Sequence, residues 1–88
     1  MGTKWEEEIG TVGHYFNHAH VAAIHVDHGR LKIGDLLHIR GNTTNIEETI
    51  QSMQVNHTEV REVGHGAYVG IPVHEKVRQH DHVYIIHQ

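Results

Sequence analysis

VAAIHVDHGR, at residues 21–30, has the pattern of a short β-strand followed by a tight turn. Ala22, Ile24 and Val26 alternate with the residues between them, so one face of the strand is apolar. Gly29 can adopt the positive φ that a tight turn requires. The stretch therefore predicts a strand at residues 21–27 with one buried face, followed by a tight turn.

The rest of the chain repeats this alternation, and no segment of ten or more residues shows helical periodicity. Five further strands are expected, at residues 9–16 (with Val12 and Phe16 on one face), 36–40, 49–56, 68–73 and 82–86. Short strands with frequent turns are typical of an all-β barrel or sandwich, and closure into a barrel removes exposed strand edges. We expect a closed barrel. Its interior should be built around five inward-facing residues, Val12, Ile24, Leu37, Val69 and Val83.

A weak internal repeat aligns LKIGDLLHI at residues 31–39 with VRQHDHVYI at residues 77–85. Gly34 is expected to be left-handed ahead of its Asp, and His80 takes the equivalent place in the second unit. The simple interpretation is that each unit is a turn that leads into a strand. The alternative is a site shared between the two Asp-bearing turns.

Length and composition limit the classes of protein. The chain has 88 residues and no cysteine, which predicts one domain without disulfides or thiolate metal sites. We expect a flexible acidic N-terminal tail at residues 1–8 and a single β-barrel domain at residues 9–88. The longest apolar run is four residues and the N-terminus has no apolar signal region, so a cytoplasmic location without membrane contact is expected. The net charge of −4 argues against strong nucleic-acid binding, and the twelve histidines would reverse that charge on mild acidification.

Several short motifs occur in order along nearly the whole chain. They are Ile-Gly-x-Val at 9–12, His-Tyr-Phe at 14–16, Leu-Lys-Ile-Gly-Asp at 31–35, Ile-Arg-Gly at 39–41, Ser-Met-Gln at 52–54, Val-Gly-Ile at 69–71 and Val-Arg-x-His-Asp-x-Val-Tyr at 77–84. Together they resemble stand-alone relatives of elongation factor Tu domain 2. The resemblance implies a closed six-stranded Greek-key barrel whose full-length relatives contact aminoacyl-tRNA and the ribosome. The phosphate-cradling motif Gly-x-x-x-x-Gly-Lys-Ser/Thr is absent, so GTP binding is not expected.

The histidines are the main departure from that family. His14, His38, His57 and His80 fall where the family pattern also tends to have histidine, but eight others do not. His18-Ala-His20 and His80-Asp-His82 are His-x-His pairs, and two such residues in a strand point to one face. His25 or His28 could add a ligand to the first pair and His87 to the second. The predicted metal ligands are therefore His18, His20, His25, His28, His80, His82 and His87, for Zn, Ni or Cu, with no cofactor required.

The sequence leaves three hypotheses for function, none of them enzymatic. The favoured one is a translation-factor-like binding or scaffold module with an unknown protein or RNA partner. The second is a histidine-rich barrel, natural or designed, that binds divalent metals and self-associates through them. The third is a weak RNA or ribosome adaptor. Ser52, the only serine, is interpreted as structural, and Tyr15, Tyr68 and Tyr84 are expected to pack in the core.

Overall fold

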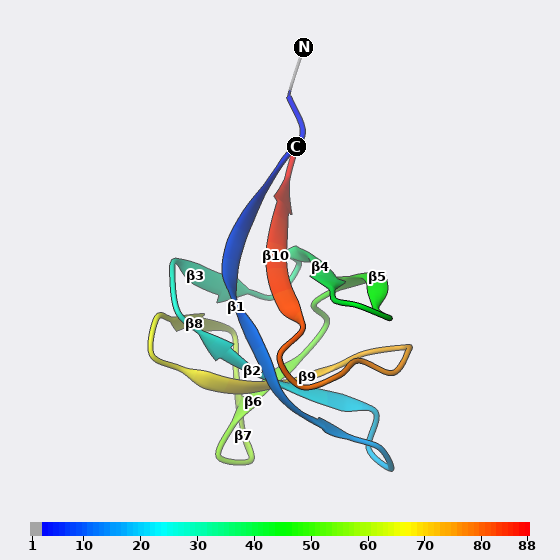
Figure 1. Ribbon diagram of the computed structural model, residues 1–88. Helices are drawn as coiled ribbons and strands as arrows, with labels where there is room; N and C mark the ends of the chain where they lie inside the picture. Colours follow the sequence, from blue (N-terminus) through cyan, green and yellow to red (C-terminus); the bar gives the residue numbers. More distant parts are fainter. Residues whose placement is uncertain (1–2) are drawn as a thin grey trace.

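The computed structural model describes residues 3–88 as β-strands joined by turns, without a helix in that range (Figure 1). No helix in it could therefore cross a membrane. The strands are β1 (Trp5–Phe16), β2 (Val21–Val26), β3 (Arg30–Lys32), β4 (Leu36–Arg40), β5 (Asn45–Thr49), β6 (Met53–Val55), β7 (Thr58–Val60), β8 (Glu62–Gly64), β9 (Tyr68–Pro72) and β10 (His82–His87). The all-β prediction is confirmed.

The closed six-stranded Greek-key barrel is wrong. Eight strands form one antiparallel sheet in the order β5-β4-β10-β1-β2-β9-β6-β7, and β3 pairs with β8 in a second small sheet. The end strands β5 and β7 do not pair with each other, so the sheet is open. Alternation along a strand shows which face is buried. It does not show whether the last strand of a sheet meets the first.

The core is a cluster of buried side chains that come from both sheets and from the connections between strands. All five residues expected inside, Val12, Ile24, Leu37, Val69 and Val83, are at most 1% exposed. These side chains come from five different strands of the large sheet, so the core joins segments distant in sequence. Their burial confirms the prediction of which face of each strand points into the core.

Strand boundaries were predicted well for one strand and poorly for the segment that follows it. The strand at residues 36–40 matches β4, while the segment at residues 49–56 is divided between the end of β5 and the whole of β6. Strands β3, β7 and β8 have three residues each. Three residues are too few to show alternation, which is why they were missed.

The first strand begins at Trp5, inside the segment expected as an acidic tail. Residues 5–8 pair with β10, and the Trp5 ring stacks on the ring of His87 at a centroid distance of 4.1 Å. Each of the three glutamates that follow Trp5 lies within hydrogen-bond distance of a histidine on β4 or β10. Met1 and Gly2, the start of the expected tail, lie outside the described residues.

The left-handed turn residues were predicted correctly. Gly29 has a φ of 69°, Gly34 a φ of 98° and His80 a φ of 76°. The third value is notable because histidine, unlike glycine, has a Cβ that disfavours this region.

Candidate functional site

A mainly apolar groove of about 380 Å³ lies between two hairpins. We call it the hairpin groove. Ten residues line it: Phe16, Ala19, Val21, Ala23, Gln54, Asn56, His57, Tyr68, Val69 and Gly70. None of them is Asp, Glu, Lys or Arg, although 20% of the chain is charged. The hairpin groove is therefore suited to an uncharged, mainly apolar ligand.

The walls of the hairpin groove are the tips of the β1–β2 and β6–β7 hairpins. Asn56 and His57 connect β6 to β7 with φ values of 50° and 64°, which is the signature of a type I′ turn. The floor comes from the paired strands β2 and β9, where Ala23 lies opposite Gly70. Alanine has only a methyl group and glycine has no side chain, so little fills the space above these two residues. The groove is therefore deep at this point.

Two exposed aromatic side chains border the hairpin groove. Phe16 is 48% exposed and Tyr68 is 47% exposed. Both were expected to face inward, and that expectation is wrong. The register of β1 against β2 shifts between Val12 and His14, so residues after this bulge change faces and Phe16 turns outward. Gly13, a glycine inside a strand, is the sequence signal that could have revealed the bulge.

Gly13 also makes room for Tyr68. A Cβ on Gly13 would lie 2.8 Å from Cε1 of Tyr68 and 2.9 Å from the ring of His25. The Tyr68 and His25 rings contact each other, with centroids 4.4 Å apart. The Tyr68 ring is therefore held over β1 at the end of the groove, between a glycine and an imidazole.

A second, more polar hollow of about 370 Å³ contains Glu48, Ser52 and His74. Glu48 Oε1 accepts hydrogen bonds from the backbone N of His74 at 2.7 Å and from its Nδ1 at 2.5 Å. The other ring nitrogen lies 3.4 Å from a carboxylate oxygen of Glu75. The hydrogen bond to Glu48 raises the pKa of His74 above its ordinary value.

This geometry does not form a nucleophile–base pair. Both ring nitrogens of His74 face carboxylates, which favours the imidazolium, and within residues 3–88 no hydrogen bond joins it to Ser52. A structural role for Ser52 stays a prediction.

A buried histidine joins β1, β4 and β5. His38 Nδ1 donates to Glu6 Oε1 at 2.9 Å, and its Nε2 donates to Asn45 Oδ1 at 2.5 Å. Burial lowers the pKa of His38, but the hydrogen bonds to Asn45 and Glu6 together outweigh burial, so the pKa is raised. His38 links three strands as a donor on both sides.

The first predicted group of metal ligands does not share a strand. His18 and His20 lie in the turn between β1 and β2, so the strand spacing assumed for them does not apply. His20 Nδ1 is 3.2 Å from the hydroxyl of Tyr15. His25, on β2, contacts Tyr68 of β9, and His28 lies in the bend that follows β2.

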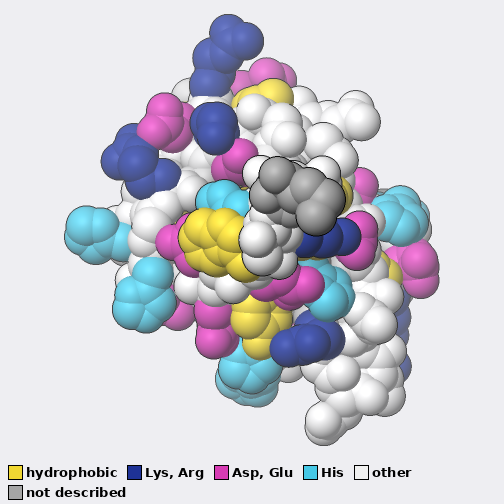
Figure 2. Space-filling model, turned by 90° about the horizontal axis from the view of Figure 1, so that it is seen from above, with side chains coloured by type: hydrophobic (Ala, Val, Ile, Leu, Met, Phe, Trp, Pro, Cys, Tyr) yellow, Lys and Arg dark blue, Asp and Glu magenta, His cyan; other side chains and the backbone are white. Residues whose placement is uncertain are grey.

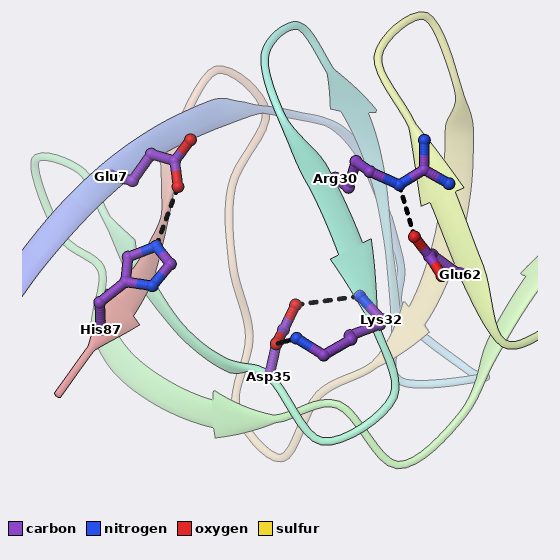
Figure 3. A network of polar contacts seen from close by, with 6 residues as sticks. All are labelled: Glu7, Arg30, Lys32, Asp35, Glu62 and His87. Carbon is purple, nitrogen blue, oxygen red and sulfur yellow. Dashed lines mark hydrogen bonds and ion pairs between the residues drawn. The ribbon is translucent and has the colours of Figure 1, made fainter.

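In the second predicted group of metal ligands, two histidines contact different carboxylates. His80 is in a turn, and His82 Nδ1 is 2.7 Å from Glu8. His87 Nε2 is 2.9 Å from Glu7, as Figure 3 shows. Figure 2 shows histidines set apart from one another on the face it presents, several beside acidic side chains. Residues 3–88 contain no group of three or more His, Cys, Asp or Glu side chains arranged around a metal position. Binding of Zn, Ni or Cu, and self-association through it, stay predictions.

Two sets of curated proteins are similar to this chain, whereas no family model matches it. An uncharacterized protease of Methanocaldococcus jannaschii is 41% identical over 80 residues, which is 90% of this chain and 19% of that protein. A collagenase of Porphyromonas gingivalis is 32% identical over 83 residues, 93% of this chain and 23% of that protein. The chain thus spans about a fifth of the length of the curated relatives it matches.

These relatives, which are named as a protease and a collagenase, overturn the predicted kinship with elongation factor Tu, the favoured translation-factor-like function and the expectation of a non-enzymatic protein. Motifs such as Gly-Asp before a strand recur in many β-proteins because they suit turns, so their order was a weak guide to ancestry. The solved C-terminal domain of a Geobacillus thermoleovorans protein named as a U32 peptidase superposes with a TM-score of 0.81 at 17% identity, over 90% of this chain and 91% of that one. Its selenomethionine variant gives a TM-score of 0.80. The chain therefore resembles about one fifth of two proteins named as a protease and a collagenase, and it has the fold of a U32 peptidase C-terminal domain.

Proposed function

We propose that this chain acts in a U32-type peptidase as the domain that binds the polypeptide substrate, and that the hairpin groove is its binding site. The relatives are named for action on proteins, and one is named for action on collagen. The observation on which the proposal depends is the groove itself. It is an uncharged hollow of about 380 Å³, bordered by two exposed aromatic rings, on a chain with a net charge of −4.

The geometry suits a short apolar segment of an extended chain. An aliphatic or proline side chain can enter over the low floor at Ala23 and Gly70, while Phe16 and Tyr68 provide flat apolar contact on the rim. The side-chain amide of Gln54, on the same lining, can pair with peptide groups of the substrate. In this proposal hydrolysis belongs to the part of such peptidases that this chain does not span.

Binding of gelatin fragments tests the proposal, because gelatin is an unfolded collagen chain that can adopt an extended shape. We would measure the anisotropy of fluorescently labelled gelatin fragments against increasing protein. Labelled polyglutamate serves as a charged comparison polymer. We expect saturable binding to gelatin and weaker binding to polyglutamate, because the lining of the groove offers no cation.

Single-residue variants locate the binding. Tyr68→Ala and Phe16→Ala should each weaken gelatin binding by up to about tenfold, since an aromatic contact contributes roughly 0.5–1.5 kcal/mol. Ile33→Ala is the matched control, because Ile33 is also an exposed apolar side chain at 38% but does not line the groove. Absence of saturable binding would refute the proposal. So would equal losses in Ile33→Ala and Tyr68→Ala.

A further inference from the structure

The two units of the internal repeat form the same turn. In the first, Asp35 Oδ2 accepts from the backbone N of Lys32 at 3.0 Å, and the Asp35 N donates back to the Lys32 carbonyl at 3.1 Å. In the second, Asp81 Oδ2 accepts from the backbone N of Arg78 at 2.8 Å, and the Asp81 N donates to the Arg78 carbonyl at 3.1 Å. One turn can therefore serve as an internal reference for the other.

The two turns differ in the contacts that their basic side chains, Lys32 and Arg78, make. Lys32 Nζ lies 3.1 Å from Asp35 Oδ1, so the turn neutralises its own charge (Figure 3). Arg78 instead donates from Nε to the Thr43 hydroxyl at 2.7 Å, and within residues 3–88 it forms no ion pair. The hydroxyl orients the guanidinium while leaving its two terminal nitrogens without a partner in that range. Arg78 is thus a positioned cation whose charge is not used internally.

Arg78 lines a hollow of about 300 Å³ together with Asn42, Gln79, His80 and His82. These side chains offer several N–H donors. The acidic residue of the same hollow, Asp81, is 6% exposed, and its Oδ2 accepts a hydrogen bond from the backbone N of Arg78. Arg78 is the lining residue that carries a fixed positive charge, on a chain whose net charge is −4.

Backbone strain at the rim of this hollow is a second, independent observation. His80 occupies the left-handed position that its counterpart Gly34 fills without strain. A non-glycine residue there costs about 1–2 kcal/mol. Strain of this kind is typical of residues whose side chain has a role at a site. His80 lines the same hollow as Arg78, so its imidazole is a second candidate donor to a ligand there.

We propose that this hollow, which we call the Arg78 pocket, binds a carboxylate, with the guanidinium as the main contact and His80 as an added donor. Two parallel N–H groups of an arginine match the two oxygens of a carboxylate in one plane. The carboxylate can be the C-terminus of a peptide or an acidic side chain, since both present the same group. The assignment does not depend on the hairpin groove.

A titration followed by ¹H–¹⁵N NMR tests the proposal on the intact chain, at constant ionic strength. The probe is N-acetylglycine, which represents a peptide C-terminus, and the Nε–H signal of Arg78 is followed. N-acetylglycinamide, with the charge removed, and inorganic phosphate are the comparison ligands. An acetylated aspartate amide represents the acidic side chain, and its affinity relative to N-acetylglycine distinguishes the two sources. We expect saturable shifts with one or both carboxylates and none with the amide.

Variants distinguish recognition by the planar guanidinium of Arg78 from attraction by its charge alone. Arg78→Lys keeps the charge but loses the planar pair of donors, and should weaken N-acetylglycine binding about tenfold. Arg61→Lys is the matched control, because Arg61 is another exposed arginine outside the pocket, and it should leave binding unchanged. His80→Gly should weaken binding while raising the melting temperature. Equal shifts with the amide, binding of phosphate alone, shifts that do not saturate, or unchanged affinity in Arg78→Lys would each overturn the proposal.

Discussion

Replacement of His80 by glycine should stabilise the protein although it removes a side chain. His80 has a φ of 76°, a region in which an L-residue with a Cβ meets the neighbouring carbonyl. The turn is otherwise complete without the imidazole, because its hydrogen bonds come from the backbone and from Asp81. Gly34 holds the same place in the sister turn. His80→Gly would thus make the second turn match the first.

The magnitude follows from two opposing effects. Relief of the left-handed conformation should contribute about 1–2 kcal/mol. Glycine also makes the unfolded chain more flexible, which costs about 0.4–1 kcal/mol. The net gain lies between about 0 and 1.6 kcal/mol, with a midpoint of about 0.8 kcal/mol. In a domain of this size the midpoint corresponds to a rise in Tm of roughly 3–6 °C.

Thermal and urea denaturation followed by circular dichroism would measure this gain. Gly34→His supplies the reverse experiment, since it introduces the same strain in the sister turn and should lower Tm. His57→Gly offers a second test, because His57 has a φ of 64° and the variant would create the Asn-Gly pair preferred in type I′ turns. A fall in Tm for His80→Gly would refute the reasoning, because it would show that the imidazole makes a contact that stabilises the turn by more than the strain destabilises it.

Two further predictions follow from packing and from charge. Gly10→Ala should destabilise the protein by about 3 kcal/mol or more, because the added Cβ would lie 1.8 Å from the backbone oxygen of His25; urea denaturation measures this, and a loss below about 1 kcal/mol would contradict it. The raised pKa of His74 contributes stability that is complete below its unfolded pKa and is lost as pH rises through the higher folded value. Glu48→Gln should therefore lower Tm more at about pH 6 than at about pH 9. Glu59→Gln, an exposed glutamate without an ion pair within residues 3–88, should show no such dependence.

Local side-chain patterns predicted the buried faces well. Val12, Ile24 and Val69 are inside because burial of alternate apolar residues dominates the energy of each strand, and that pattern is visible in the chain itself. The left-handed turns at Gly34 and His80 were predictable for a similar reason, since only a few residue types tolerate positive φ. Ancestry was not predictable from the same motifs. Turn-and-strand pieces recur in unrelated β-proteins.

The sites needed information on how distant strands meet. Phe16 and Tyr68 border one groove because a bulge at Gly13 and the pairing of β2 with β9 bring their strands together. Arg78 is an available cation because Thr43, 35 residues away, accepts its Nε–H.

The amino-acid sequence by itself therefore determined that this protein is all-β, that alternate aliphatic side chains form its core, and that Gly29, Gly34 and His80 are left-handed. The tertiary structure alone decided that the large sheet stays open and which exposed side chains share a surface. Burial and backbone conformation depend on neighbours within a few residues. Closure and site assembly depend on pairings between strands far apart in the chain, which local patterns do not encode.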